Sequence, residues 1–177
     1  NLASSVTDKS KNKIVIPVTS SAVLKETSDG TVMTGSVKVP YNASLEAALE
    51  GRNSFTIETV VTPTGDPEFN MFAGKGDGAF ALRTRKGFLD FFVYAGGKWR
   101  PYYYQMPSDM ASSWIGKKHQ IAGIYNASDN TLKLYADGKI LGSMNTDTTE
   151  GVAHSDFRFT IGACPDTGRR SQAEFSQ

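Results

Sequence analysis

The chain has 177 residues and a mass of 19.2 kDa, which fits one domain large enough to bury its own core. Its 19 basic and 18 acidic residues give a net charge of +1, without the basic excess of nucleic-acid-binding domains. The single cysteine, Cys164, excludes an intrachain disulfide and a cysteine-rich zinc site. We therefore expect no nucleic-acid partner, and the lack of a long apolar run predicts no membrane insertion.

The first third of the chain contains few regular elements. Residues 1–12 are mostly polar and predict a linker or a frayed end, followed by one domain over residues 13–177. Short β-prone segments occur at residues 14–18 and 32–39. Residues 42–49 show the only helical spacing of apolar residues. Since the first residue is not Met, we expect the chain to be a piece of a longer protein.

The remainder of the chain predicts strands and no further helix. Turn signals rich in glycine, with centres near residues 77, 87 and 97, separate short alternating segments in the manner of a meander or sandwich. Many strands with almost no helix indicate an all-β antiparallel fold of two sheets. The expected strands are 55–61, 69–73, 79–85, 88–94, 99–106, 119–125, 131–136, 140–145 and 157–161.

Short motifs between about residues 30 and 165 occur in an order that resembles one family of β-sandwiches. They are Phe55–Glu58, Lys75–Asp77, Trp114, His119–Gly123, Asp137–Lys139 and Ile161–Gly162. The series resembles the laminin-G-like, concanavalin A-like lectin and glucanase family. This resemblance implies a jelly-roll sandwich, and in such a fold we expect Trp114 to pack in the core at one end of the sheets.

The C-terminus departs from the family pattern. Family members usually finish with a Gly-x-Ile-Asp strand and an apolar run, whereas this chain stops at Gln177, where that strand should begin. Either the chain was cut, or residues 14–18 close the sheet, or the last strand was left out. We therefore expect an open or differently closed sheet edge near the C-terminus.

The sequence lacks the pattern of a jelly-roll glycoside hydrolase. Such enzymes place their carboxylates on one strand face as Glu-x-Asp-x-x-Glu, and no such pattern occurs. Cys164 and His119 predict packing roles rather than nucleophilic catalysis. The acidic residues that could be considered for catalysis are scattered. Glu58 stands alone in a strand, Asp66 and Glu68 lie in a loop, and Glu46 and Glu50 lie on a solvated helix face. We expect no catalysis by this domain.

One segment, residues 83–105, is dense in the side chains that bind sugars. Aromatic faces stack on the C–H patches of a pyranose, and planar polar groups hydrogen-bond its hydroxyls. Strand alternation places Leu89, Phe91 and Val93 in the core, so that the residues between them face outward. The candidate carbohydrate-binding residues are Arg83, Arg85, Asp90, Tyr94, Lys98, Trp99, Tyr102 and Tyr103.

Structural roles remain open for several of these residues. Trp99 follows a double-glycine turn and either binds a ligand or covers a core edge. Arg83 and Asp90 could instead form a surface ion pair of little energetic value. At least one of the residues 102–104 must point inward because neighbours alternate. A structural calcium ion is an open expectation, with candidates Asp66, Asp77, Asp129, Asp147 and Asp156 but no calcium loop of fixed spacing.

The resemblance implies a non-catalytic carbohydrate-binding module. Its partners would be a glycan, with terminal galactose as the leading ligand, and the rest of a parent bacterial glycoside hydrolase that is secreted or attached to the cell wall. An adhesion or protein-interaction domain of the same fold is the main alternative. A sialic-acid-binding module is a further one, in which Arg83 and Arg85 would clamp the carboxylate.

Overall fold

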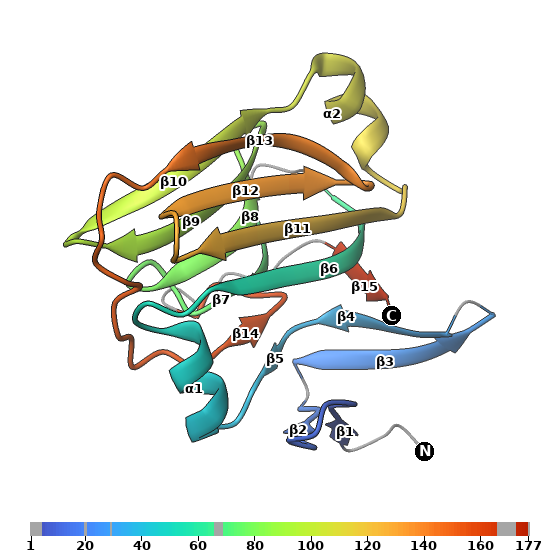
Figure 1. Ribbon diagram of the computed structural model, residues 1–177. Coiled ribbons are helices and arrows are strands. Elements are labelled where there is room, and N and C mark those ends of the chain that lie inside the picture. The colour runs from blue at the N-terminus through green and yellow to red at the C-terminus, as the bar shows by residue number, and fades with distance from the viewer. Residues whose placement is uncertain (1–4, 20, 29, 66–68, 166–172, 177) are drawn as a thin grey trace.

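Two antiparallel β-sheets packed face to face make up most of the molecule (Figure 1). The computed structural model describes residues 5–19, 21–28, 30–65, 69–165 and 173–176. In spatial order, one sheet contains β10 (Lys98–Gln105), β9 (Phe88–Ala95), β8 (Phe80–Arg85), β7 (Phe69–Gly74), β14 (Thr160–Ile161) and β5 (Val37–Lys38). The other contains β13 (Lys139–Asn145), β12 (Thr131–Ala136), β11 (His119–Asn126), β6 (Phe55–Pro63), β15 (Ala173–Ser176), β4 (Gly30–Gly35) and β3 (Ala22–Thr27). The predicted two-sheet antiparallel architecture is confirmed.

The core lies between the sheets and follows the predicted alternation. Leu89, Phe91 and Val93 on β9 are fully buried, and they meet buried residues such as Ile121 and Leu134 of the facing sheet. Burial of apolar side chains at about 25 cal/mol per Å² is the main force that holds such a sandwich together. Because successive strand residues point to opposite faces, this packing fixes which residues face away from the core.

Two helices flank the sandwich, and one of them was not predicted. The helix α1 (Ala43–Leu49) begins at Asn42, whose side chain accepts a hydrogen bond from the Leu45 amide at 3.0 Å. The helix α2 (Ser108–Trp114) contradicts the expectation of strands alone. It carries few apolar residues for a periodic signal, but it ends on Trp114, which is fully buried and stacks on the His119 ring at 4.0 Å. The predicted core position of Trp114 is confirmed.

The N-terminal part of the described chain differs from expectation. Residues 5–7, placed in a linker by their polarity, form β1 and pair with β2 (Val15–Pro17) in a separate two-stranded sheet. The segment 14–18 therefore does not close the sandwich. Ala22–Thr27 forms the edge strand β3, which was not predicted.

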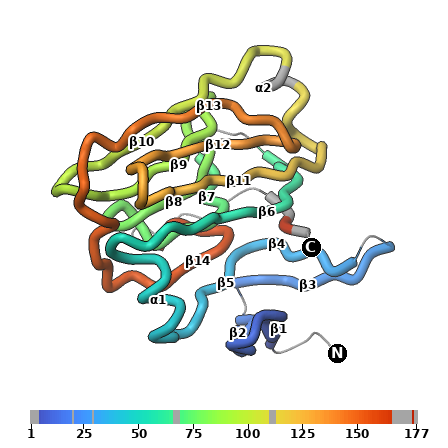
Figure 2. Tube along the Cα trace, in the orientation of Figure 1, coloured from blue at the N-terminus to red at the C-terminus, as the bar shows by residue number. Residues whose placement is uncertain are grey.

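A strand forms close to the C-terminus, where an open or differently closed sheet edge was expected. The strand β15 lies between β6 and β4 inside the larger sheet (Figure 1). Figure 2 shows the courses of β6 and β4 themselves. Its Phe175 is 7% exposed and lies opposite Val61 of β6. A four-residue strand with one core aromatic residue offers too little alternation to be recognised from sequence. No helix among the described residues is long and apolar enough to span a membrane.

A close approach between the sheets gives a first prediction. A Cβ added at Gly123 on β11 would lie 2.5 Å from the Phe91 ring on β9. We expect Gly123→Ala to lower the free energy of unfolding by about 1–3 kcal/mol through overpacking, as measured by urea denaturation. Phe91→Leu removes the ring, so the double variant should lose less stability than the two single losses added together. If the loss of unfolding free energy in the double variant equals the sum of the two single losses, this contact does not limit the spacing of the sheets.

Candidate functional site

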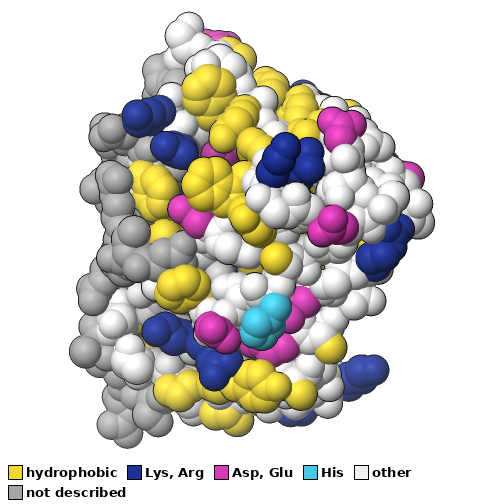
Figure 3. Space-filling model, turned by 90° about the vertical axis from the view of Figure 1, so that its left-hand side faces the viewer, with side chains coloured by type: hydrophobic (Ala, Val, Ile, Leu, Met, Phe, Trp, Pro, Cys, Tyr) yellow, Lys and Arg dark blue, Asp and Glu magenta, His cyan; other side chains and the backbone are white. Residues whose placement is uncertain are grey.

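The outer face of β8, β9 and β10 brings most of the predicted site residues together. Strand register places Tyr94 opposite Trp99, Phe92 opposite Pro101, Asp90 opposite Tyr103, and Arg83 opposite Asp90. These residues alternate with the core residues of the same strands, so they share one face. The side of the molecule that carries the β9–β10 hairpin mixes hydrophobic side chains with charges of both signs (Figure 3).

Arg83 and Asp90 form a buried ion pair rather than the surface pair considered from the sequence. Arg83 Nε donates to Asp90 Oδ1 at 3.0 Å and to Oδ2 at 3.3 Å, and the two side chains are 8% and 0% exposed. The Arg83 guanidinium also lies over the Phe92 ring, 4.6 Å from its centroid. Loss of hydration raises the pKa of Asp90 to about 6, against the attraction of Arg83.

Asp77 joins this pair to Trp99. The Asp77 carboxylate, on a side chain that is 49% exposed, accepts from Arg83 Nη1 at 3.2 Å. Its backbone carbonyl accepts from Trp99 Nε1 at 2.7 Å. Trp99 is 60% exposed, so its indole edge is held while much of the side chain stays open to solvent. An exposed tryptophan fixed by its N–H is a preformed platform for a ligand with an apolar face.

These residues line a hollow of about 90 Å³. Four of the eight predicted site residues take part: Arg83, Arg85, Trp99 and Tyr103 line it, together with Asp77, Phe92 and Pro101. Aromatic faces, a carboxylate and guanidinium groups thus surround one small space. That combination provides stacking and hydrogen-bonding groups for a hydroxyl-rich ring.

The other predicted residues take different positions. Asp90 lies on the same face, buried with Arg83. Tyr94 lies opposite Trp99 and donates to the Gly97 carbonyl at 2.9 Å, which supports the hairpin turn. Lys98 is exposed but does not line the hollow.

Tyr102 does not line the hollow. It packs against the core, and its hydroxyl donates to the Leu141 carbonyl at 3.1 Å. Tyr104 packs on the same side, which bears out the expectation that at least one tyrosine of this run points inward.

Three lining residues were missed or given another role by the sequence analysis. Phe92 and Pro101 lie two residues from Asp90 and Trp99 respectively and so share their faces. Strand periodicity gives the outward direction of Phe92, but neither residue was named as a candidate. From the sequence, Asp77 is part of the Lys75–Asp77 motif and a calcium candidate. Its contacts with Arg83 and Trp99 depend on how separate turns meet, which no local pattern reveals.

A buried lysine holds the turn that carries Asp77. Lys75 is 0% exposed, and its Nζ bonds to Glu46 of α1 and, at 2.6 Å, to Glu50, the residue that follows this helix. These glutamates are 12% and 19% exposed, so the expected solvated helix face is wrong. Partial burial would raise the pKa of Glu50, but hydrogen bonds from Lys75 and His154 outweigh it and hold that pKa below its usual value.

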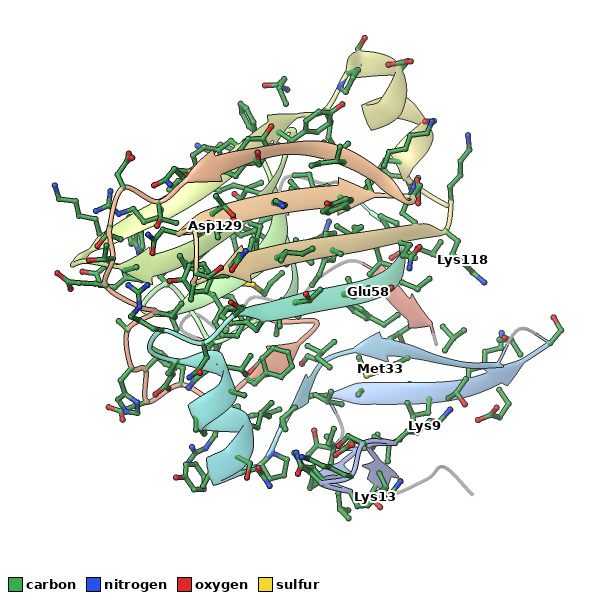
Figure 4. All side chains as sticks on the ribbon, viewed as in Figure 1. Lys9, Lys13, Met33, Glu58, Lys118 and Asp129 are labelled. Atoms are coloured by element: carbon green, nitrogen blue, oxygen red, sulfur yellow. The ribbon has the colours of Figure 1, made fainter. Side chains whose placement is uncertain are left out.

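The remaining acidic candidates lie apart from the hollow. Asp66 and Glu68 fall outside the described residues. Glu58 lies on β6 of the other sheet, where it accepts from Gln120, and Asp129 lies at the turn between β11 and β12 (Figure 4). Across residues 5–165, apart from their gaps at 20, 29 and 66–68, no three His, Cys, Asp or Glu side chains form a group that could hold a metal ion.

A larger hollow of about 490 Å³ lies beside β5 and β14, at the far edge of the same sheet. Proline and small hydroxyl residues make up much of its lining, together with Lys38, Arg158 and Cys164, and its described lining contains no aromatic residue. Since sugar recognition depends strongly on aromatic stacking, we assign the candidate site to the smaller hollow. Cys164 is buried, as expected.

The raised pKa of Asp90 predicts a defined dependence of stability on pH. Between the unfolded value of 3.8 and about 6, the folded protein keeps a proton that the unfolded chain has released. Relative to Asp90→Asn, the wild-type protein should therefore lose about 1–3 kcal/mol of unfolding free energy as pH rises from about 4 to about 6. Urea denaturation of both proteins from pH 4 to 8 measures this difference. A difference that grows in favour of the wild type over that range would show that Arg83 lowers the pKa instead.

Solved structures with a similar fold were found at low sequence identity. The binding domain of Paraclostridial Mosquitocidal Protein 1 is 14% identical, with a TM-score of 0.71 over 100% of this chain and 49% of that one. The binding domain of botulinum neurotoxin DC in complex with SialylT is 11% identical, with a TM-score of 0.55 over 98% and 40% of the two chains. This chain thus spans about half or less of those proteins' length.

A third similar structure is the CBM40 module of Ruminococcus gnavus IT-sialidase bound to α2,3-sialyllactose. It is 14% identical, with a TM-score of 0.54 over 75% of this chain and 77% of that one. At these identities the structures establish the shared fold. Comparison with curated protein sequences gives no match.

A family model provides the assignment at the level of sequence. The model of the concanavalin A-like lectin/glucanases superfamily matches residues 29–177, which includes β15 and most of the two large sheets. The match extends beyond the region of resemblance, which covers about residues 30–165, and includes β15. The chain belongs to the concanavalin A-like lectin/glucanases superfamily.

Proposed function

We propose that this chain is a non-catalytic carbohydrate-binding module that holds a glycan on the outer face of β8, β9 and β10. The observation that carries the proposal is Trp99, 60% exposed and fixed through its N–H beside the Asp77 carboxylate. The indole face provides a stacking surface, and Asp77 and Tyr103 provide hydrogen-bonding groups at the same hollow.

The carboxylates of the hollow support binding rather than hydrolysis. A glycosidase needs two carboxyl groups that flank the scissile bond and reach its atoms. Asp90 is fully buried, and both Asp90 and Asp77 are bonded to Arg83. Asp90 is therefore out of reach of a ligand, and Asp77 alone cannot supply the pair of carboxyl groups that hydrolysis needs.

Galactose is the proposed terminal sugar. Its axial 4-hydroxyl leaves one ring face with a continuous patch of C–H groups, which suits stacking on a flat indole such as Trp99. The charges around Arg83 also favour an uncharged ring, because Arg83 is neutralised by Asp77 and Asp90. A clamp of Arg83 and Arg85 on a sialic-acid carboxylate is therefore disfavoured, since Arg83 is already engaged.

We further propose that the module belongs to a secreted or cell-wall-attached bacterial glycoside hydrolase and keeps it near its glycan. The Ruminococcus gnavus module, which is part of a sialidase, offers a parallel for this arrangement. Release of reducing sugar by this chain alone would contradict a purely binding role.

The platform role of Trp99 gives the central test. We expect Trp99→Ala to weaken binding of lactose or another terminal galactoside about tenfold or more, since truncation removes the stacking surface. Isothermal titration calorimetry measures this loss, with maltose as the sugar that lacks terminal galactose. Tyr41→Ala is the matched control, because Tyr41 is an aromatic residue 62% exposed that does not line the hollow.

Other outcomes separate the alternatives. If Trp99→Ala binds lactose as well as the wild type does, this hollow is not the binding site. If a glycan array gives no binding at all, the adhesion or protein-interaction alternative is favoured, because exposed aromatic residues such as Trp99 and Tyr103 are also typical of protein interfaces.

A further inference from the structure

A second hollow adjoins the first on the same sheet face. It has a volume of about 290 Å³ and is lined by Arg85, Lys86, Phe88 and Tyr103. Arg85 and Tyr103 line both hollows, so the two spaces adjoin. A ligand of two or more sugar residues lying on Trp99 could therefore extend into the second hollow.

The second hollow has a defined backbone frame. Lys86 and Gly87 form the β8–β9 turn, with φ values of 49° and 80° that are typical of a tight hairpin. The Gly87 carbonyl accepts from the Met106 amide at 3.0 Å and from the Gln105 side chain at 3.2 Å, which ties the turn to the end of β10. The two cations are thus presented from a supported turn rather than from a free loop.

The charges of the two hollows differ sharply. Arg83, in the first hollow, is matched by the carboxylates of Asp77 and Asp90. In the second hollow both charged lining residues, Arg85 and Lys86, are cations, and neither forms an ion pair with any described residue. Both are exposed and therefore accessible to a ligand.

The aromatic wall of the second hollow adds a surface for a sugar ring. Tyr103 is 49% exposed and packs edge-on against Phe88, with ring centroids 5.9 Å apart and an interplanar angle of 67°. The guanidinium fork of Arg85 matches the paired oxygens of a carboxylate or a sulfate, and Lys86 adds a point charge. A ring carrying such a group would meet apolar, hydrogen-bonding and cationic partners together.

We propose that the hollow of Arg85, Lys86, Phe88 and Tyr103 is a second subsite, which binds a carboxylate or sulfate group on the part of the glycan next to the sugar that lies on Trp99. This inference rests on the proposed glycan-binding function and adds the class of ligand. It assigns the anion to Arg85 and Lys86, and leaves Arg83 to the internal structure of the first hollow.

The test compares three probes: lactose, lactose sulfated on its glucose, and sialyllactose. For each protein the readout is the ratio of the affinity for a charged probe to the affinity for lactose, so that any effect on the first hollow cancels. We expect a ratio of about ten for at least one charged probe at low salt, and a fall toward one at 1 M NaCl, where charge interactions are screened. The two charged probes distinguish a sulfate from a carboxylate.

Variants assign the effect to the subsite. Lys86→Gln should lower the ratio about threefold, and Arg85→Gln/Lys86→Gln should bring it to about one. Lys117→Gln/Lys139→Gln removes the same charge from two exposed lysines outside both hollows and should retain the wild-type ratio. Thermal unfolding of each variant verifies that the fold is kept.

Each contrary result has a distinct meaning. A wild-type ratio of one for both charged probes, with lactose bound, overturns the anionic subsite and leaves the proposed function standing. Persistence of the ratio in Arg85→Gln/Lys86→Gln, or its equal loss in Lys117→Gln/Lys139→Gln, also overturns the subsite. Failure of all three probes to bind overturns the proposed galactoside function and this inference with it.

Discussion

The buried ion pair of Arg83 and Asp90 organises the candidate site. Two charges lie on the outer face of a sheet, where water normally solvates them, yet both are almost fully buried. Burial of a charge is costly unless hydrogen bonds and an opposite charge compensate, so removal of either partner would leave the other stranded. The pair fixes the Arg83 guanidinium over the Phe92 ring, and the same guanidinium donates to the Asp77 carboxylate. The Asp77 backbone carbonyl in turn accepts from the Trp99 indole N–H. The exposed platform thus depends on a buried charge.

A second buried charge supports the turn that carries Asp77. Lys75 is fully buried and bonded to Glu46 of α1 and to Glu50, which follows the helix, so the helix and the turn are tied by charge as well as by packing. Asp77 follows only two residues later. The helix, which lies at the bottom of the sandwich in Figure 1, thereby helps to position a site formed on other strands. Rigid support of this kind lowers the entropy that a ligand must remove on binding.

Sequence periodicity predicted the parts of the site that depend on strand alternation. The outward direction of Arg83, Arg85 and Asp90 followed from the core positions between them, and the two-sheet fold followed from the turn spacing. Burial could not be predicted, because an outer face is expected to meet water and the ion pair was accordingly placed at the surface. Contacts between separate turns, such as that of Asp77 with Trp99, could not be predicted from the sequence either. The short strand β15 and the helix α2 depend on single buried aromatic residues, Phe175 and Trp114, which leave no periodic pattern.

Charge is distributed unevenly along the face that these interactions create. Two carboxylates are bonded to Arg83, whereas Arg85, at the end of β8, and Lys86, in the turn that follows, form no ion pair with a described residue. An uncharged sugar is suited to the first region and an anionic group to the second, so a glycan carrying both would bind in one direction. The ion pair therefore does more than support Trp99. By neutralising Arg83 it leaves the unpaired positive charge at Arg85 and Lys86 in the second hollow, and this asymmetry would give the ligand its orientation.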